Sequence, residues 1–124
     1  MSKVNTTIAI VVDENFGERL QSLADQMPVW VADTPTNRTV AEALWSQAGS
    51  NITTFRVSAG DDAAEWCHAI LPQVESHHGE YSPSPPLNSI EVFGARATPT
   101  LRDAFSKYGF TISSKRADGF RAVR

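Results

Sequence analysis

The chain is short of the features on which several classes of protein depend. It has a single cysteine, Cys67, in 124 residues, which excludes an internal disulfide framework. No apolar run approaches the roughly 20 residues that a membrane-spanning helix needs. The N-terminal segment lacks the apolar stretch of a secretory signal. We therefore expect a cytoplasmic protein that makes no membrane contact.

Motifs of common nucleotide-dependent and hydrolytic enzymes are also missing. Gly17, Gly60 and Gly94 stand alone, so neither glycine-rich pattern that cradles phosphate groups is present. There is no G-x-S-x-G nucleophile turn. Cys67 lies beside the apolar stripe of a predicted helix, and we interpret it as a packed small hydrophobe rather than a nucleophile. The sequence assigns no catalytic residue and no organic cofactor.

Histidine and cysteine are too poorly spaced to predict a metal site. Structural zinc sites use about four nitrogen or sulfur ligands, commonly in pairs separated by two to four residues. Cys67 and His68 are neighbours on a predicted helix and point about 100° apart. His77 and His78 are adjacent as well. We expect no metal at these four residues.

What the chain does contain is enough apolar sequence for one domain. Hydrophobic residues make up 41% of the chain, a proportion typical of a globular domain of this length, so we predict a single domain over residues 1–124. The run TIAIVV at 7–12 is continuously apolar and β-branched. Such a run is typical of a strand that is covered on both faces.

Strand and helix patterns alternate four times along the chain. Strands are predicted at 7–12, 29–32, 52–58 and 89–94, and a helix follows each of them. Residues 110–115 and 120–124 read as a closing hairpin with Asp118 and Gly119 in its turn. The alternation predicts an α/β fold, a three-layer sandwich with a mostly parallel sheet of about five strands, helices on both faces and a C-terminal antiparallel hairpin.

Capping residues predict where the four helices begin. The four N-caps are Asn15, Thr39, Asp62 and Thr98, because each carries a side-chain oxygen that accepts a hydrogen bond from an amide of the first turn. Pro72 falls inside the third helix, where it removes a backbone donor and clashes one turn back. We expect a kink or an early end of the helix there.

Polar side chains follow the predicted strands, where parallel sheets bind their ligands. The candidates are Asp13, Asp33, Asn37, Arg38, Asp61 and Arg96. The three aspartates would hold Mg²⁺, which prefers oxygen ligands, and Asn37, Arg38 or Arg96 would bind a phosphate group. Helix capping is the alternative role for such residues, because helices begin at this same edge.

A second group of residues suits contact with another protein. Trp45 lies one position off the apolar stripe of its helix, which predicts an exposed aromatic side chain. The segment HHGEYSPSPP reads as a stiff connection that either spaces two elements or contacts a partner. The partner-binding candidates are Trp45, His77, His78, Tyr81, Arg116 and Arg121.

Charge is distributed unevenly along the chain. Residues 96–124 hold seven basic and two acidic residues, a net charge of +5, whereas residues 1–95 hold four basic and twelve acidic residues, a net charge of −8. A basic tail sometimes binds nucleic acid, here through Arg102, Lys115, Arg116, Arg121 and Arg124. Without interleaved aromatic residues this signal is weak, and two parts that attract each other, or a head-to-tail dimer, explain the asymmetry as well.

Two functions from different classes follow. The first is a cytoplasmic, non-catalytic interaction or regulatory module, a homodimer in one version, whose partner is a protein or a second copy of the chain. The alternative is a small-ligand-binding protein or an Mg²⁺-dependent enzyme that acts on a phosphorylated compound at the carboxyl edge of the sheet. Whether the protein is an enzyme is left open.

Overall fold

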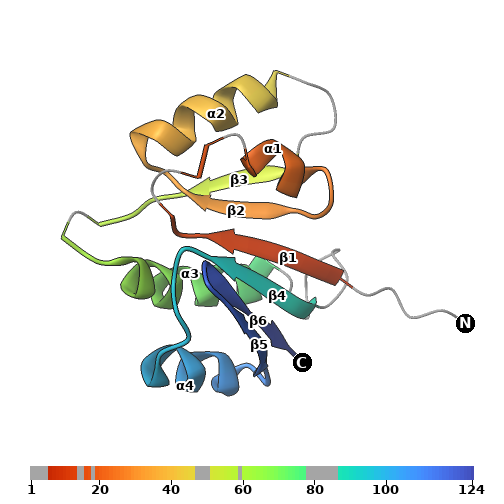
Figure 1. Ribbon diagram of the computed structural model, residues 1–124, viewed down its shortest axis with the longest axis vertical. Coiled ribbons are helices and arrows are strands. Elements are labelled where there is room, and N and C mark those ends of the chain that lie inside the picture. Colours follow the sequence, from red (N-terminus) through yellow and green to blue (C-terminus); the bar gives the residue numbers. More distant parts are fainter. Residues whose placement is uncertain (1–5, 14–15, 18, 47–50, 59, 78–86) are drawn as a thin grey trace, which may run out of the picture.

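The computed structural model describes residues 6–13, 16–17, 19–46, 51–58, 60–77 and 87–124. Within them, six strands form one sheet and four helices pack on it (Figure 1). The strands are β1 (Thr6–Val11), β2 (Val29–Ala32), β3 (Ile52–Phe55), β4 (Leu87–Phe93), β5 (Thr111–Arg116) and β6 (Gly119–Val123). The helices are α1 (Arg19–Ala24), α2 (Pro35–Trp45), α3 (Ala63–His77) and α4 (Pro99–Lys107). None of these helices is both long and apolar enough to cross a membrane.

The strands follow the order β3-β2-β1-β4-β6-β5. The first four strands in the sequence run parallel, β6 runs antiparallel to β4, and β5 runs antiparallel to β6. The predicted α/β fold with a C-terminal antiparallel hairpin is therefore confirmed, with six strands rather than about five. The chain builds outward from β1 to β3 and then returns to the other side of β1 as β4, so the strand order reverses between β1 and β4.

Strand β1 is buried on both faces, as its continuous apolar sequence predicted. Ala9 and Val11 pack toward α1 and α2, and Ile8 and Ile10 pack toward α3 and α4. All four side chains have no exposed surface. Figure 1 shows the two helix pairs on opposite sides of the sheet, which makes the sheet the middle of three layers.

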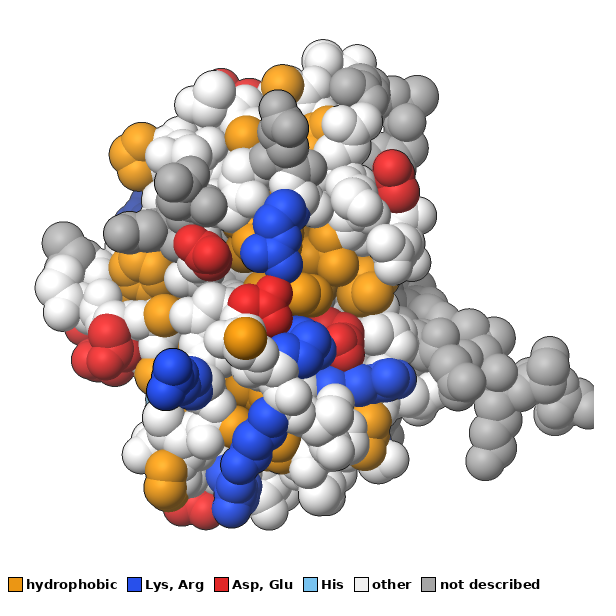
Figure 2. Space-filling model, in the orientation of Figure 1, with side chains coloured by type: hydrophobic (Ala, Val, Ile, Leu, Met, Phe, Trp, Pro, Cys, Tyr) orange, Lys and Arg blue, Asp and Glu red, His pale blue; other side chains and the backbone are white. Residues whose placement is uncertain are grey.

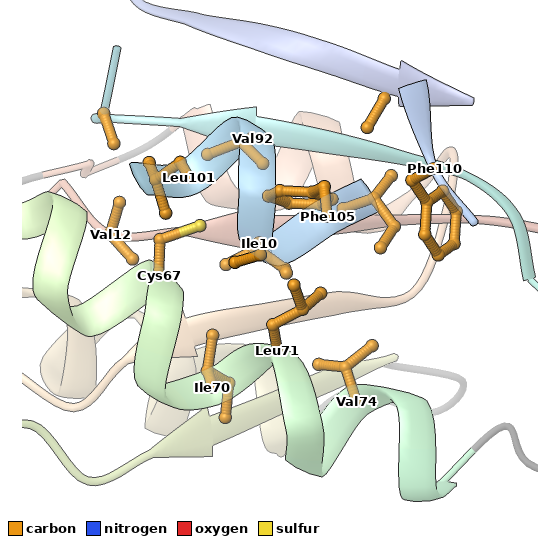
Figure 3. Packing of buried hydrophobic residues seen from close by; sticks show 14 of the residues in the cluster. Ile10, Val12, Cys67, Ile70, Leu71, Val74, Val92, Leu101, Phe105 and Phe110 are labelled. Atoms are coloured by element: carbon orange, nitrogen blue, oxygen red, sulfur yellow. The ribbon is translucent and has the colours of Figure 1, made fainter. Parts of the chain in front are cut away.

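The larger core lies between the sheet and the pair α3 and α4. Figure 3 shows side chains of α3, among them Cys67 and Leu71, facing Phe105 of α4 across this space. Phe105 is fully buried and meets the rings of Phe110 and Phe120 edge to face, at centroid distances of 6.1 and 5.5 Å. Edge-to-face pairs at these distances are favourable beyond the area they bury, so Phe105 joins α4 to the C-terminal hairpin.

The two faces of the sheet are covered to different extents. The core under α1 and α2 draws on β1, β2 and β3, with Phe93 of β4 at its border, and includes no side chain of β5 or β6. No described helix lies over β4, β6 and β5 on that face (Figure 1). On the face that α1 and α2 cover, strands β4, β6 and β5 therefore have no described helix over them, and we call this region the open half-face.

One predicted helix start is wrong. Helix α2 is capped by Thr34, whose side chain accepts a hydrogen bond from the Asn37 amide, and not by Thr39. Pro35 occupies the first helical position, which suits proline because no backbone donor is needed there. Of the two outcomes expected at Pro72, an early end is contradicted because α3 continues to His77, and a kink stays a prediction. Asn15 lies outside the described residues.

The other two caps are confirmed. The Asp62 carboxylate accepts from the Glu65 amide at 2.9 Å, and Thr98 accepts from the Leu101 amide at 3.2 Å. In the closing hairpin the two turn residues are Ala117 and Asp118, because Gly119 already pairs with Arg116 as the first residue of β6. A Cβ atom at Gly119 would lie 1.8 Å from the carbonyl oxygen of Val92. Glycine is needed there because β6 approaches β4 closely, not because the turn requires it.

Candidate functional site

At the carboxyl edge of the sheet, Asn37 is a structural bridge. Its side chain is fully buried. The side-chain amide donates to the carbonyl oxygens of Asp13, at 2.7 Å, and Ala32, at 3.2 Å, and the side-chain oxygen accepts from the Phe16 amide at 3.0 Å. These bonds tie the segment after β1 to the segment after β2. They also occupy the groups with which Asn37 would have bound a phosphate.

The backbones that follow β1 and β4 touch at the point where the strand order reverses. A Cβ atom at Gly94, which has φ of +99°, would lie 2.4 Å from the Asp13 amide nitrogen. The Val12 amide donates to the Phe93 carbonyl at 2.9 Å. Crevices at such reversal points commonly bind ligands in α/β proteins. Here there is no room between these two backbones for even a methyl group.

Asp33 and Arg38 pair with each other instead of facing an open site. Their closest atoms are 3.2 Å apart, and Arg38 also contacts Glu42 at 3.0 Å. The second carboxylate oxygen of Asp33 is buried and has no hydrogen-bond partner within the described chain. The arginine predicted to hold a phosphate is therefore engaged by two carboxylates.

Asp61 lies in a separate cavity of about 490 Å³ between the first turns of α3 and α4. The cavity is lined by Asp61, Asp62, Ala64, Glu65, His68, Thr98, Thr100 and Leu101. A hydrogen bond from the Glu65 side chain to Asp61, together with repulsion between the two carboxylates, raises the pKa of Glu65. Protonation lets this pair share a hydrogen bond where two charges would repel.

The predicted Mg²⁺ ligands are not brought together. In the part of the chain that the structure describes, no three His, Cys, Asp or Glu side chains are placed to hold a metal ion. Asp13, Asp33 and Asp61 therefore do not form such a group. Arg96 is exposed, in the connection that leads into α4.

Cys67 is fully buried in the core under α3. Removal from water disfavours the thiolate and raises the pKa of Cys67 to about 12. Because the thiolate is the nucleophilic form of cysteine, burial and the raised pKa disfavour Cys67 as a nucleophile at neutral pH.

Trp45 is exposed, as its position off the helix stripe predicted. With 42% of its surface accessible, it is the one large hydrophobic residue in the described chain with this exposure. Its indole N–H donates to the Ile52 carbonyl at 2.9 Å. Trp45 thus joins the end of α2 to β3, one edge of the sheet.

Arg116 and Arg121 belong to a group of paired charges that we call the arginine network. It comprises Arg19, Glu91, Arg116, Asp118 and Arg121. Glu91 holds Arg116 at 2.9 Å and Arg121 at 3.6 Å, and Asp118 holds Arg19 at 2.7 Å and Arg116 at 3.4 Å. The Arg19 hydrogen bond lowers the pKa of Asp118.

The arginine network takes the place of a helix over the open half-face. The Arg116 guanidinium lies 4.6 Å from the centre of the Phe93 ring, and Arg19 lies 4.6 Å from that of Phe16. Figure 2 shows positive and negative side chains alternating over the middle of this face, with apolar atoms beside them. Guanidinium planes cover apolar rings well because they are weakly hydrated and stack. We interpret this network first as a structural cover.

The partner-binding candidates do not form one continuous surface. Trp45 is hydrogen-bonded to β3, and Arg116 lies in β5. These strands are at opposite edges of the six-stranded sheet, and five strand spacings of about 4.8 Å put them about 24 Å apart. The His77 side chain, His78 and Tyr81 lie outside the described residues.

A groove that the sequence did not predict runs between α4 and β5. Its volume is about 480 Å³, and it is lined by Arg102, Ser106, Phe110, Thr111, Ile112 and Lys115. Arg102 and Lys115 are exposed, and neither forms an ion pair with a described residue. Helical spacing places Arg102 and Ser106 on one side of α4, but their position beside β5 depends on tertiary packing.

Comparison of the chain with protein-family models, with curated proteins and with solved structures found no match. What the protein does therefore has to be inferred from its own residues and their arrangement.

Proposed function

We propose that this chain is a non-catalytic interaction module that binds an acidic partner protein beside α4 and β5. The observation that supports this most is the pair Arg102 and Lys115, two exposed cations that line one groove and lack an ion-pair partner among the described residues. Complementary charge speeds association and selects among partners. A local basic surface does this even on a chain whose net charge is −3.

The other basic residues of the hairpin support contact with a partner less well. Arg116 and Arg121 already pair with Glu91, and Arg124 pairs with Glu75 at 2.7 Å. A partner that engaged these guanidinium groups would have to compete with carboxylates of the chain itself. Charges that are already neutralised contribute little to a new interface.

A different protein is a better occupant of the groove than a second copy of the chain. A two-fold dimer places the same surface of each subunit against its equivalent. Arg102 and Lys115 would then approach their own copies, and like charges placed face to face are unfavourable. A homodimer through some other surface would leave this groove free.

The alternative function, a small ligand at the carboxyl edge, has less support. The cavity between α3 and α4 has the size of a small-molecule site. Its described lining includes three carboxylates, Asp61, Asp62 and Glu65, and no lysine or arginine. These charges repel a phosphorylated compound.

A photo-crosslinking experiment tests the interaction module. Ser106→Cys places a thiol in the groove, and Ser22→Cys places one on the exposed side of α1 as a control. Because Cys67 is buried with a raised pKa, a maleimide–benzophenone reagent labels only the introduced thiol. After irradiation in a lysate of the source cells, we expect a protein adduct at position 106 that is absent at position 22.

Charge variants show whether that adduct depends on the groove. Arg102→Glu with Lys115→Glu should abolish it. Arg56→Glu with Arg96→Glu changes the net charge equally at two other exposed sites and should preserve it. Adducts formed equally at both thiols, a nucleic-acid adduct, or an adduct indifferent to the groove charges would contradict the proposal.

A further inference from the structure

Strand β5 is an edge of the sheet. It is last in the strand order and, among the described strands, pairs only with β6. Its six residues are all exposed or half-exposed. The side of an edge strand that faces away from the sheet presents backbone N–H and C=O groups to which another strand can bond.

The edge carries two features that oppose pairing with an identical strand. Ser113 is an extra residue in β5, because Ile112 and Ser114 pair with consecutive residues of β6. Such a bulge bends the strand, and a lysine on the edge repels basic strands. Lys115 is that lysine here. The bulge hinders any added strand, whereas Lys115 repels copies of β5 and attracts a strand of opposite charge.

The groove lies along this edge and supplies contacts for side chains. Phe110 is 2% exposed and forms an apolar base together with Ile112, while Ser106 and Thr111 add hydroxyl groups. Arg102 on α4 and Lys115 on β5 bring the two cations into the lining of one groove. An added strand uses backbone hydrogen bonds for affinity and alternate side chains for specificity.

The geometry points to strand addition: an extended acidic peptide segment of a partner protein pairs with β5 as a seventh strand. The side chains on one face of this strand, every second residue, meet the groove: acidic ones face Arg102 and Lys115, and apolar ones lie toward Phe110 and Ile112. This inference rests on the proposed interaction module and adds how the partner binds. Single-stranded nucleic acid is a poorer occupant because such binding uses exposed aromatic rings for stacking, and the aromatic residue in this lining, Phe110, is buried.

Selection from a random eight-residue peptide library tests the inference. Panning against the full chain should enrich peptides in which Asp or Glu and Val, Ile or Thr occupy every second position, so that both kinds of side chain face the groove. The best peptide should bind Arg102→Glu with Lys115→Glu about tenfold or more weakly, the loss expected when two attractive charges become repulsive. It should bind the control Arg56→Glu with Arg96→Glu as it binds the unchanged chain.

Two N-methylated versions of the selected peptide separate strand addition from simple charge attraction. Successive backbone amides of a strand point to opposite edges. Methylation of the set that faces β5 should weaken binding about tenfold or more, because a bond is lost and a methyl group intrudes. Methylation of the other set should leave affinity unchanged.

The outcomes of the two experiments can be told apart. If both methylated peptides bind equally while the charge variant fails, the interaction module stands and strand addition is wrong. If no acidic peptide is enriched, or the selected peptides ignore the groove charges, strand addition to β5 is likewise overturned. Loss of the crosslink at position 106 would instead count against the interaction module itself.

Discussion

The two halves of the sheet are built by different means. In the half formed by β3, β2 and β1, helices lie on both faces, and β1 and β2 place apolar side chains on both. In the half formed by β4, β6 and β5, helices cover one face and the arginine network covers part of the other. Strand β4 shows the change within its own sequence, where Ile90 and Val92 are fully buried and Glu91 between them faces its arginines.

The comparison shows how a sheet face remains ordered without a helix over it. A helix buries apolar side chains, and the energy scales with the area removed from water. The arginine network offers less apolar burial, but it fixes five charged side chains and shields Phe93 with the Arg116 guanidinium. Strand β5 is also the last strand in the order, so the same half of the sheet provides the groove proposed as a binding site.

The largest expected effect on stability comes from a large-to-small substitution in the core between α4 and strands β4, β6 and β5, the half of the sheet that has a core on one face only. Phe105→Ala removes a fully buried ring that touches Phe110 and Phe120. We expect a loss of about 3–5 kcal/mol in the free energy of unfolding. Urea denaturation measures this loss.

Leu20→Ala, in the core under α1, is the matched change for the other half, with a loss of about 2–5 kcal/mol. Hydrogen exchange should show the difference between the halves. Phe105→Ala should raise exchange in β5 and β6 before β2 and β3. Uniform acceleration in both halves would show that they unfold as one unit.

Sequence patterns captured the parts of the fold that depend on local chemistry. The apolar run of β1 predicted burial on both faces, and Thr98 followed by Pro99 predicted the start of α4. The same Thr-Pro pair opens α2 at Thr34. It was missed because Thr39 and Glu42, five residues further on, also match a capping pattern.

The candidate sites were harder to predict because they depend on contacts between distant residues. Glu91 precedes Arg116 by 25 residues, and nothing in either local sequence indicates their pairing. The Asn37 side chain reaches Asp13 across 24 residues, which turns a predicted ligand-binding residue into a bridge. The groove exists only because α4 packs beside an edge strand, and strand order could not be derived from the alternation of helices and strands.

The next largest effect should follow from removing the charge at the centre of the arginine network. Glu91→Gln keeps the shape of the side chain but leaves Arg116 and Arg121 without their shared carboxylate. We expect a loss of about 1.5–2 kcal/mol, at the lower part of the range for hydrogen bonds to charged groups because the site is partly exposed. Since the Glu91 side chain is only 14% exposed, most of this loss should persist in 1 M NaCl. A loss that vanished with salt would show that the network acts as a loose surface pair.

A smaller effect should appear in the pH dependence of stability, with opposite signs at two carboxylates. The pKa of Asp118 is lowered in the folded chain, mainly by the Arg19 hydrogen bond. Its contribution is therefore complete above the unfolded pKa of about 3.9 and is lost as pH falls through the folded pKa. The destabilisation caused by Asp118→Asn should shrink over that window.

The contribution of Glu65 to stability should depend on pH in the opposite direction, because Glu65 faces another carboxylate whereas Asp118 faces arginines. Its pKa is raised, mainly by the hydrogen bond to Asp61. Its contribution is present below the unfolded pKa of about 4.3 and is lost as pH rises through the folded pKa. Glu65→Gln, whose side-chain amide can donate to Asp61 at every pH, should keep this stabilisation at the pH where the unchanged chain loses it. Carboxyl NMR titrations of both residues check the two directions, and shifts of the same sign would contradict the assignment.

The smallest effect should come from an ion pair in the half of the sheet that helices cover on both faces. Arg38 and Glu42 are 3.0 Å apart on α2, with side chains 57% and 58% exposed. Exposed pairs at this helical spacing contribute about 0.3–0.5 kcal/mol, so Glu42→Gln should cost no more than that and should cost nothing in 1 M NaCl. The helices already hold this half together, whereas Glu91 organises a face that has no helix. Denaturation experiments could show equal losses in the free energy of unfolding for Glu42→Gln and Glu91→Gln. The arginine network would then contribute no more than an ion pair on an exposed helix face. The structural distinction between the two halves would in that case rest on apolar burial alone.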